Sequence, residues 1–186
     1  MEYITSSDFH FKDTAVALGK FEGIHRGHQL LMDEVKKQEL HGLRSVVFTF
    51  DRPTRLTLTG DTEYKQIYTK KERREILEKR GIDILIEHPF TKEFAALTPD
   101  RFIREVLVEK VGAKVIVVGT DFHFGKNRSG SITDLEKLEE ECGYHLIVVE
   151  KLQLNGKDIS STRIRASLEK GACLLYTSPS PRDMRR

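Results

Sequence analysis

A glycine-rich turn between an apolar run and a helical segment constrains this chain most. The run Thr14–Leu18 has the composition of a short buried strand, and the turn Gly19–His28 follows it directly. Apolar side chains at helical spacing then extend over Gln29–His41. Glycines let the backbone approach a ligand closely, and free N–H groups at a helix start attract anions. The arrangement predicts a phosphate-binding turn in which His25 and His28 face one phosphate; a tight turn with surface histidines is the alternative.

Strand and helix patterns alternate along the chain. Further strands are predicted at 45–50, 82–86, 114–118 and 145–149, with 16–18 as the first and a short extra one at 152–154 before an Asn-Gly turn. Helical patterns cover 69–80, 98–112, 132–142 and 160–170, several with Ser or Thr caps. Five strands joined by helices predict an α/β, Rossmann-like fold, a five-stranded parallel sheet with helices on both faces.

A second candidate site is the loop Gly119–Gly130, which follows the predicted strand at 114–118. Ligands of such sheets bind at the carboxyl ends of the strands, near the point where strand order reverses. Phe122 and Phe124 could enclose a planar ring, and Arg128 offers a bidentate fork for phosphate. A flexible surface loop with phenylalanines folded onto the core is the alternative.

A third candidate is the start of the last predicted helix, Ile159–Arg165. Its hydroxyls, followed by Arg163 and Arg165, suit a polyphosphate, although an ordinary N-cap has the same composition. The two arginines point in different directions on a helix, so we expect one of them to face the site.

Composition excludes several classes of protein. The chain has 186 residues, 38% hydrophobic and 32% charged, which suits one globular domain. With 31 basic and 29 acidic residues, it lacks the charge of a general nucleic-acid or membrane-surface binder. Neither a membrane-spanning run nor a secretory signal is evident, so we expect a cytoplasmic protein without a disulfide. No cysteine–histidine cluster has zinc spacing, and no third ligand accompanies His25 and His28.

The C-terminal segment differs from the rest. Gly171 is the last residue that resembles natural protein, and Cys173–Asp183 resembles the translation of an adapter used in preparing sequencing libraries. We therefore expect one domain over 1–171, and a tail at 172–186 that is an artefact and disordered. A natural Ser/Pro-rich tail is the alternative.

The motifs also carry a family resemblance. His25-Arg26-Gly27-His28 resembles the signature of the nucleotidylyltransferase superfamily, whose members join a nucleoside monophosphate to an acceptor and release pyrophosphate. Together, the three candidate segments resemble the adenylyltransferase module of prokaryotic FAD synthetase, over nearly all of Phe9–Gly171. The segment Phe90–Phe102 is also typical of that family.

The resemblance implies a nucleotidylyltransferase fold that transfers AMP from ATP to FMN with Mg²⁺, giving FAD and pyrophosphate. Mg²⁺ would bridge phosphate oxygens and keep several waters, so few protein ligands are expected. The usual family protein carries a C-terminal β-barrel domain that phosphorylates riboflavin. We expect that domain, and its activity, to be missing from this chain.

The resemblance also assigns residues. The catalytic groups would be His28, His25 and Arg165, with His28 stabilising the transition state. ATP would be bound by Gly19, Phe21, Gly23, Gly27, Gly119, Asp121, Ser161 and Thr162. The flavin would be bound by Phe50, Phe122, Phe124 and Arg128.

The chain departs from the family pattern in places. Lys20 stands where Asn is more usual, Glu22 where Asp is, and Asp51-Arg52-Pro53-Thr54 follows Phe50 where Glu-Pro-His-Pro is common. The last change weakens any transfer of flavin contacts to that segment. Two alternatives stay open: another phosphorylated acceptor, such as pantetheine phosphate or nicotinamide mononucleotide, and a non-catalytic nucleotide- or flavin-binding module.

Overall fold

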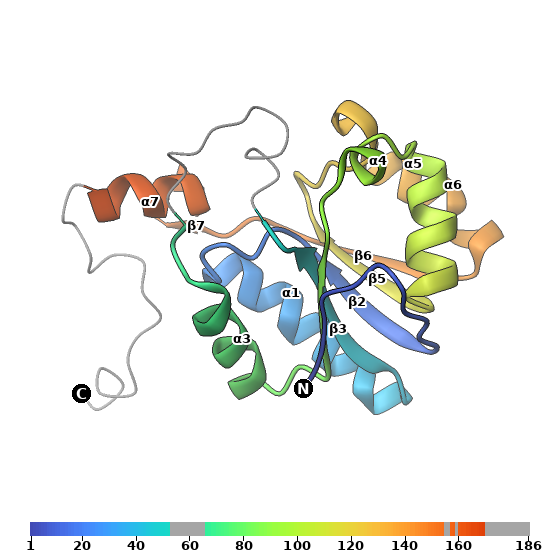
Figure 1. Ribbon diagram of the computed structural model, residues 1–186, viewed down its shortest axis with the longest axis horizontal. Coiled ribbons are helices and arrows are strands. Elements are labelled where there is room, and N and C mark those ends of the chain that lie inside the picture. The colour runs from blue at the N-terminus through green and yellow to red at the C-terminus, as the bar shows by residue number, and fades with distance from the viewer. Residues whose placement is uncertain (53–65, 155–156, 159, 170–186) are drawn as a thin grey trace.

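Parallel strands form the centre of the molecule (Figure 1). The computed structural model describes residues 1–52, 66–154, 157–158 and 160–169, so Pro53-Thr54, the Asn155-Gly156 turn and the predicted tail lie outside the described residues. The sheet order is β1-β4-β3-β2-β5-β6, and every pairing in it is parallel. The strands are β1 (Glu2–Ile4), β2 (Thr14–Leu18), β3 (Arg44–Phe50), β4 (Ile84–His88), β5 (Ala113–Gly119) and β6 (His145–Val149).

The predicted parallel α/β architecture is confirmed, but the number of strands is wrong: the sheet has six strands, not five. The extra strand is β1, three residues that pair with β4 at the sheet edge. So short a strand shows no alternation in the sequence. The strand expected at 82–86 also begins two residues later, at Ile84.

Helices cover both faces of this sheet. In Figure 1, α1 (Arg26–Lys37) and α3 (Lys70–Lys79) lie on one side, and α5 (Pro99–Arg101) and α6 (Ile132–Cys142) lie on the other. α5 continues as η2 (Phe102–Lys110), a wider helix that ends with the Val111 N–H donating to the Val106 carbonyl, five residues back. The shorter elements are η1 (Gln38–His41), α4 (Lys92–Ala95), η3 (Lys126–Arg128), the antiparallel pair β7 (Gln153–Leu154) and β8 (Lys157–Asp158), and α7 (Ser161–Glu169).

Two apolar cores explain why the strands are apolar throughout. Ala15, Ala17 and Val47 pack with α1 on one face of the sheet. Val16 and Phe48 pack with η2 and α6 on the other face. A strand buried on both faces has no polar side to alternate with. None of the helices in the described part of the chain is long and apolar enough to cross a membrane.

The strand order places the candidate loops together. β2 pairs with β3 on one side and with β5 on the other, so the chain leaves the carboxyl ends of β2 and β5 in opposite directions. Such a reversal opens a crevice at the end of the sheet. The turn after β2 and the loop after β5 both border it.

Candidate active site

The turn after β2 has an unusual backbone. Phe21 and Ile24 have positive φ angles of 47° and 30°, which bulky side chains rarely adopt. Both side chains are buried in the core beneath the turn. Burial of these two side chains therefore holds a strained turn in place, as is common at ligand sites. Because the Phe21 side chain is buried, only the backbone of this predicted ATP-binding residue is available to contact a nucleotide.

His25 begins α1 and defines the start of the site. Its Nδ1 accepts a hydrogen bond of 3.4 Å from the His28 backbone N–H, as an N-cap side chain does. An accepting Nδ1 places the proton of the neutral ring on Nε2. The His25 and His28 rings stack with centroids 3.8 Å apart. The two imidazoles predicted to share a phosphate therefore lie face to face at the start of a helix.

Burial keeps both imidazoles neutral. Desolvation lowers the pKa of His25 to about 4, partly offset by the charge of Asp121. Desolvation, and then the neighbouring His25, place the pKa of His28 well below its usual value. Nδ1 of His28 is buried without a hydrogen-bond partner among the described residues. Since buried polar atoms are nearly always paired in folded proteins, this ring is a candidate ligand contact.

The start of α7 lies against the same turn. A Cβ on Gly23 would lie 3.0 Å from Ile67 Cδ1, which is tight, whereas Ser161 Oγ at 3.4 Å and Ile164 Cδ1 at 3.5 Å would be ordinary van der Waals neighbours. α7 therefore packs on this turn at Gly23. Arg165 Nη2 is 2.8 Å from Glu22 Oε2, with both side chains largely buried. The first and third predicted motifs, about 140 residues apart, thus come together, with Arg165 facing the turn. Thr162 is exposed on the same first turn of α7.

The loop after β5 contributes a carboxylate beside the histidines. Asp121 is close enough to His25 to affect its pKa, and its Oδ2 lies 3.0 Å from Lys151 Nζ. Gly119 precedes it at the end of β5. A predicted ATP-binding residue and a lysine that the sequence analysis did not single out therefore border the crevice together.

The aromatic residues predicted for the flavin lie at two ends of one cluster. Phe122 and Phe124 stack at 5.5 Å, and Phe124, itself mostly buried, contacts Phe102 at 5.3 Å. Phe50 is at the far end, joined to Phe102 through Phe94. The loop phenylalanines thus pack on the core, while Phe50 borders a pocket.

Arg128, the last residue predicted for the flavin, lies on the surface of the loop after β5. Arg128 is exposed and has a positive φ of 58°. Within the described residues, no group of three or more His, Cys, Asp or Glu side chains could hold a metal ion.

Several residues of the site have no distinct signal in the sequence. Lys151 follows β6 and belongs to no motif in the sequence, yet it forms an ion pair with Asp121. Glu22 was noted only as a departure from a family pattern, but it holds Arg165. Arg73 and Glu87 form a buried ion pair beside the turn. A charged residue in an apolar strand was the one available signal for Glu87.

Comparison with known proteins agrees with this geometry. A family model described as FAD synthetase matches residues 8–163. The chain belongs to the FAD synthetase family. It is 32% identical over 155 residues to the bifunctional riboflavin kinase/FMN adenylyltransferase of Escherichia coli K12, covering 82% of this chain and 49% of that protein. The Listeria monocytogenes protein with the same name is 31% identical over 170 residues, covering 90% of this chain and 54% of that protein. The chain thus spans about half the length of these curated relatives.

Solved structures support the fold. A structure described as a macrolide-efflux protein from Streptococcus pneumoniae superimposes with a TM-score of 0.78 at 29% identity, covering 90% of this chain and 57% of that chain. A pantoate-beta-alanine ligase from Francisella tularensis superimposes with a TM-score of 0.56 at 15% identity, covering 87% of this chain and 73% of that chain. The second likeness concerns the fold alone.

Proposed function

We propose that this chain transfers AMP from ATP to FMN, giving FAD and pyrophosphate. One observation carries the proposal: the start of α7 packs on the turn that holds the stacked histidines, through Gly23 and the Glu22–Arg165 pair. Such a site has hydroxyl, guanidinium and imidazole donors around one point at a helix start, as a polyphosphate requires. Membership of the FAD synthetase family supports the choice of FMN as the acceptor.

The chemistry follows from charge. A phosphate oxygen of FMN attacks the α-phosphorus of ATP, the new P–O bond forms, and the bond to the bridging oxygen breaks as pyrophosphate leaves with the electron pair. No general base is needed, because the attacking phosphate is already ionised. Attacker and target are both anionic, so the protein must neutralise charge and hold them in line.

Individual residues take roles in this proposal. His28 donates to the α-phosphate as charge builds on it, and His25 offers its Nε2–H beside it. Ser161, Thr162 and Arg165 bind the phosphates that leave. Mg²⁺ would accompany ATP and neutralise its phosphates. We expect this activity in the cytoplasm, where the free Cys142 would stay reduced.

The test is direct. The purified full chain is incubated with FMN, labelled ATP and Mg²⁺, and FAD is separated by chromatography. Label in FAD supports the proposal, and His28→Ala serves as the matched control. In parallel reactions, pantetheine phosphate or nicotinamide mononucleotide replaces FMN, and label transferred to one of them but not to FMN would assign a different acceptor. Absence of any transfer, with flavin binding retained, would indicate a binding module.

A further inference from the structure

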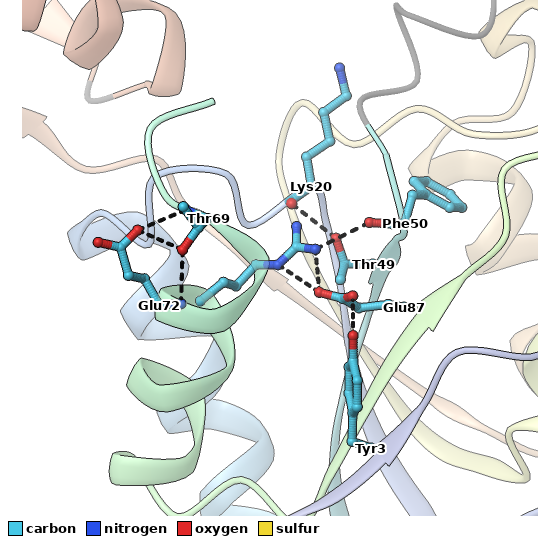
Figure 2. A network of polar contacts seen from close by, with 8 residues as sticks. Tyr3, Lys20, Thr49, Phe50, Thr69, Glu72 and Glu87 are labelled. Carbon is cyan, nitrogen blue, oxygen red and sulfur yellow. Dashed lines mark hydrogen bonds and ion pairs between the residues drawn. The ribbon is translucent and has the colours of Figure 1, made fainter. Parts of the chain in front are cut away.

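A buried carboxylate lies beneath the end of β3. Glu87, on β4, is fully buried. Its Oε2 accepts a hydrogen bond of 2.6 Å from the Tyr3 hydroxyl, and its Oε1 accepts one of 3.0 Å from Arg73 Nε (Figure 2). Burial, followed by the hydrogen bond to Glu87, raises the pKa of Tyr3 to about 12, so the phenol stays a donor. A buried carboxylate needs such partners, and here they fix the position of Arg73.

The hydrogen bonds to Glu87 leave one nitrogen of the Arg73 guanidinium available to a ligand. Arg73 Nη2 donates to Glu87 and also to the Phe50 carbonyl at 3.3 Å. Its Nη1 has no hydrogen-bond partner among the residues that the structure describes. The Arg73 side chain is only 11% exposed, and it lines a pocket at the carboxyl ends of β2 and β3. We call this the β3 pocket; its lining includes Lys20, Glu22, Phe50, Arg52, Tyr68 and Arg73.

A second cation stands on the rim of the β3 pocket. The Thr49 hydroxyl donates to the Lys20 carbonyl at 2.9 Å, which fixes the backbone of Lys20 at the pocket. The Lys20 side chain extends away from this network (Figure 2). In the described part of the chain, its ammonium forms no ion pair. The other lining charges are matched, Arg52 by Asp51, Arg73 by Glu87, and Glu22 by Arg165. Counted over the described lining residues alone, the pocket therefore has one unmatched positive charge, that of Lys20.

The β3 pocket adjoins the nucleotide site. Glu22 lines the pocket and contacts Arg165, and it lies three residues before His25 on the same turn. An acceptor phosphate must lie beside the α-phosphate for in-line attack. We propose that the β3 pocket binds the phosphomonoester of the acceptor, with Lys20 and Arg73 as its cations and Tyr3 and Glu87 as positioning residues for Arg73. The proposal rests on the function proposed above.

Binding of two flavins that differ only in the phosphate tests it. Dissociation constants of FMN and riboflavin are measured by flavin fluorescence for the full chain and for Lys20→Gln and Arg73→Lys. Hydrogen bonds to charged groups predict that FMN binding weakens about ten- to a hundredfold while riboflavin binding changes less than about twofold. Lys20 is exposed, so its variant keeps the fold, and Arg73→Lys keeps a charge opposite Glu87. Lys71→Gln, an exposed cation on the same helix, is the matched control and should change neither constant.

The positioning role has its own test. Tyr3→Phe should raise the KM for FMN several-fold with little change in kcat, since Arg73 loses orientation but not charge. Tyr144→Phe is the matched control, because it removes another buried hydroxyl contact, to the Leu135 carbonyl, far along the sheet from the pocket.

Two results would overturn the inference: an unchanged ratio of FMN to riboflavin affinity in Lys20→Gln and Arg73→Lys, or an equal loss of both flavins. These results are distinct from failure of the proposed function, in which the unaltered protein would form no FAD from FMN and ATP.

Discussion

Arg165 Nη2 lies 2.8 Å from Glu22 Oε2, and this contact joins the last helix to the turn after the second strand. The two side chains are 18% and 10% exposed, so the charges meet largely out of water. The pair thereby holds a guanidinium against the turn that carries the stacked histidines. Pre-placed donors of this kind lower the cost of ordering a site around a nucleotide.

Arg165→Ala should weaken ATP binding about ten- to a hundredfold, because a charge-assisted contact to phosphate is lost. Arg163→Ala, two positions earlier on α7, is the matched control, since residues two apart do not share a helix face. Titration calorimetry with ATP and Mg²⁺ measures both. Equal losses in the two variants would contradict the assignment of Arg165 to the phosphates.

His28→Ala should lower the rate of FAD formation about 10²–10³-fold while ATP affinity falls less. A donor that acts mainly on the transition state affects rate more than ground-state binding. Single-turnover kinetics, together with equilibrium binding of ATP, separate the two quantities. A variant that kept half of its activity would exclude His28 as the donor.

Riboflavin should not accept AMP. The riboflavin hydroxyl would need a general base to remove its proton. Burial lowers the pKa of both histidines of the site, which makes their neutral rings weak bases. The unaltered protein is given riboflavin or FMN at equal concentration with labelled ATP. Equal labelling of the two flavins would refute a mechanism built on a phosphate nucleophile.

The extent to which the sequence predicts this site depends on local signals. His25, Gly23 and Ser161 stand in turn and cap patterns that the sequence displays, and their positions follow from strand–turn–helix physics. The helical pattern predicted from residue 69 with a Ser or Thr cap is likewise confirmed: Thr69 caps α3 and forms a capping box with Glu72. Such features depend on residues close together in the chain.

The remaining features depend on contacts between distant residues. The Tyr3–Glu87 bond spans 84 positions and the Arg165–Glu22 bond spans 143. β1 forms because it pairs with the edge of β4. A strand of three residues is too short to show an alternating pattern in the sequence. Phe124, whose contact with a flavin stays a prediction, packs its ring against Gly130: a Cβ added to that glycine would lie 2.9 Å from the ring. Composition alone does not distinguish a ring that binds a ligand from one that packs inward.

Lowering the pH from 6.5 to about 4 should destabilise the protein, because burial keeps His25 unprotonated in the folded state over this pH range. Burial lowers its pKa from 6.5 to about 4. Well above pH 6.5 the ring is neutral in both the folded and unfolded states, so its titration does not change stability there. Between pH 6.5 and about 4 the unfolded chain binds a proton that the folded chain does not, and stability falls as pH falls.

His25→Asn isolates this effect, because asparagine keeps the N-cap hydrogen bond without titrating. The unfolding midpoint, Tm, is followed by circular dichroism at several pH values. The variant should lose less stability than the unaltered protein between pH 6.5 and 4. Parallel curves for the two proteins would exclude His25 as a source of the acid sensitivity.

The buried ion pair should destabilise the fold when half of it is removed. Glu87 is fully buried and Arg73 is 11% exposed, so Glu87→Leu leaves a guanidinium without its carboxylate in a poorly solvated place. We expect a loss of about 3–5 kcal/mol in the free energy of unfolding. The double variant Arg73→Met/Glu87→Leu should recover much of that loss, because no unpaired charge remains. Urea unfolding of the single and double variants measures the coupling. Additive losses in the double variant would mean that the two side chains act independently, and that Glu87 does not hold Arg73 in place.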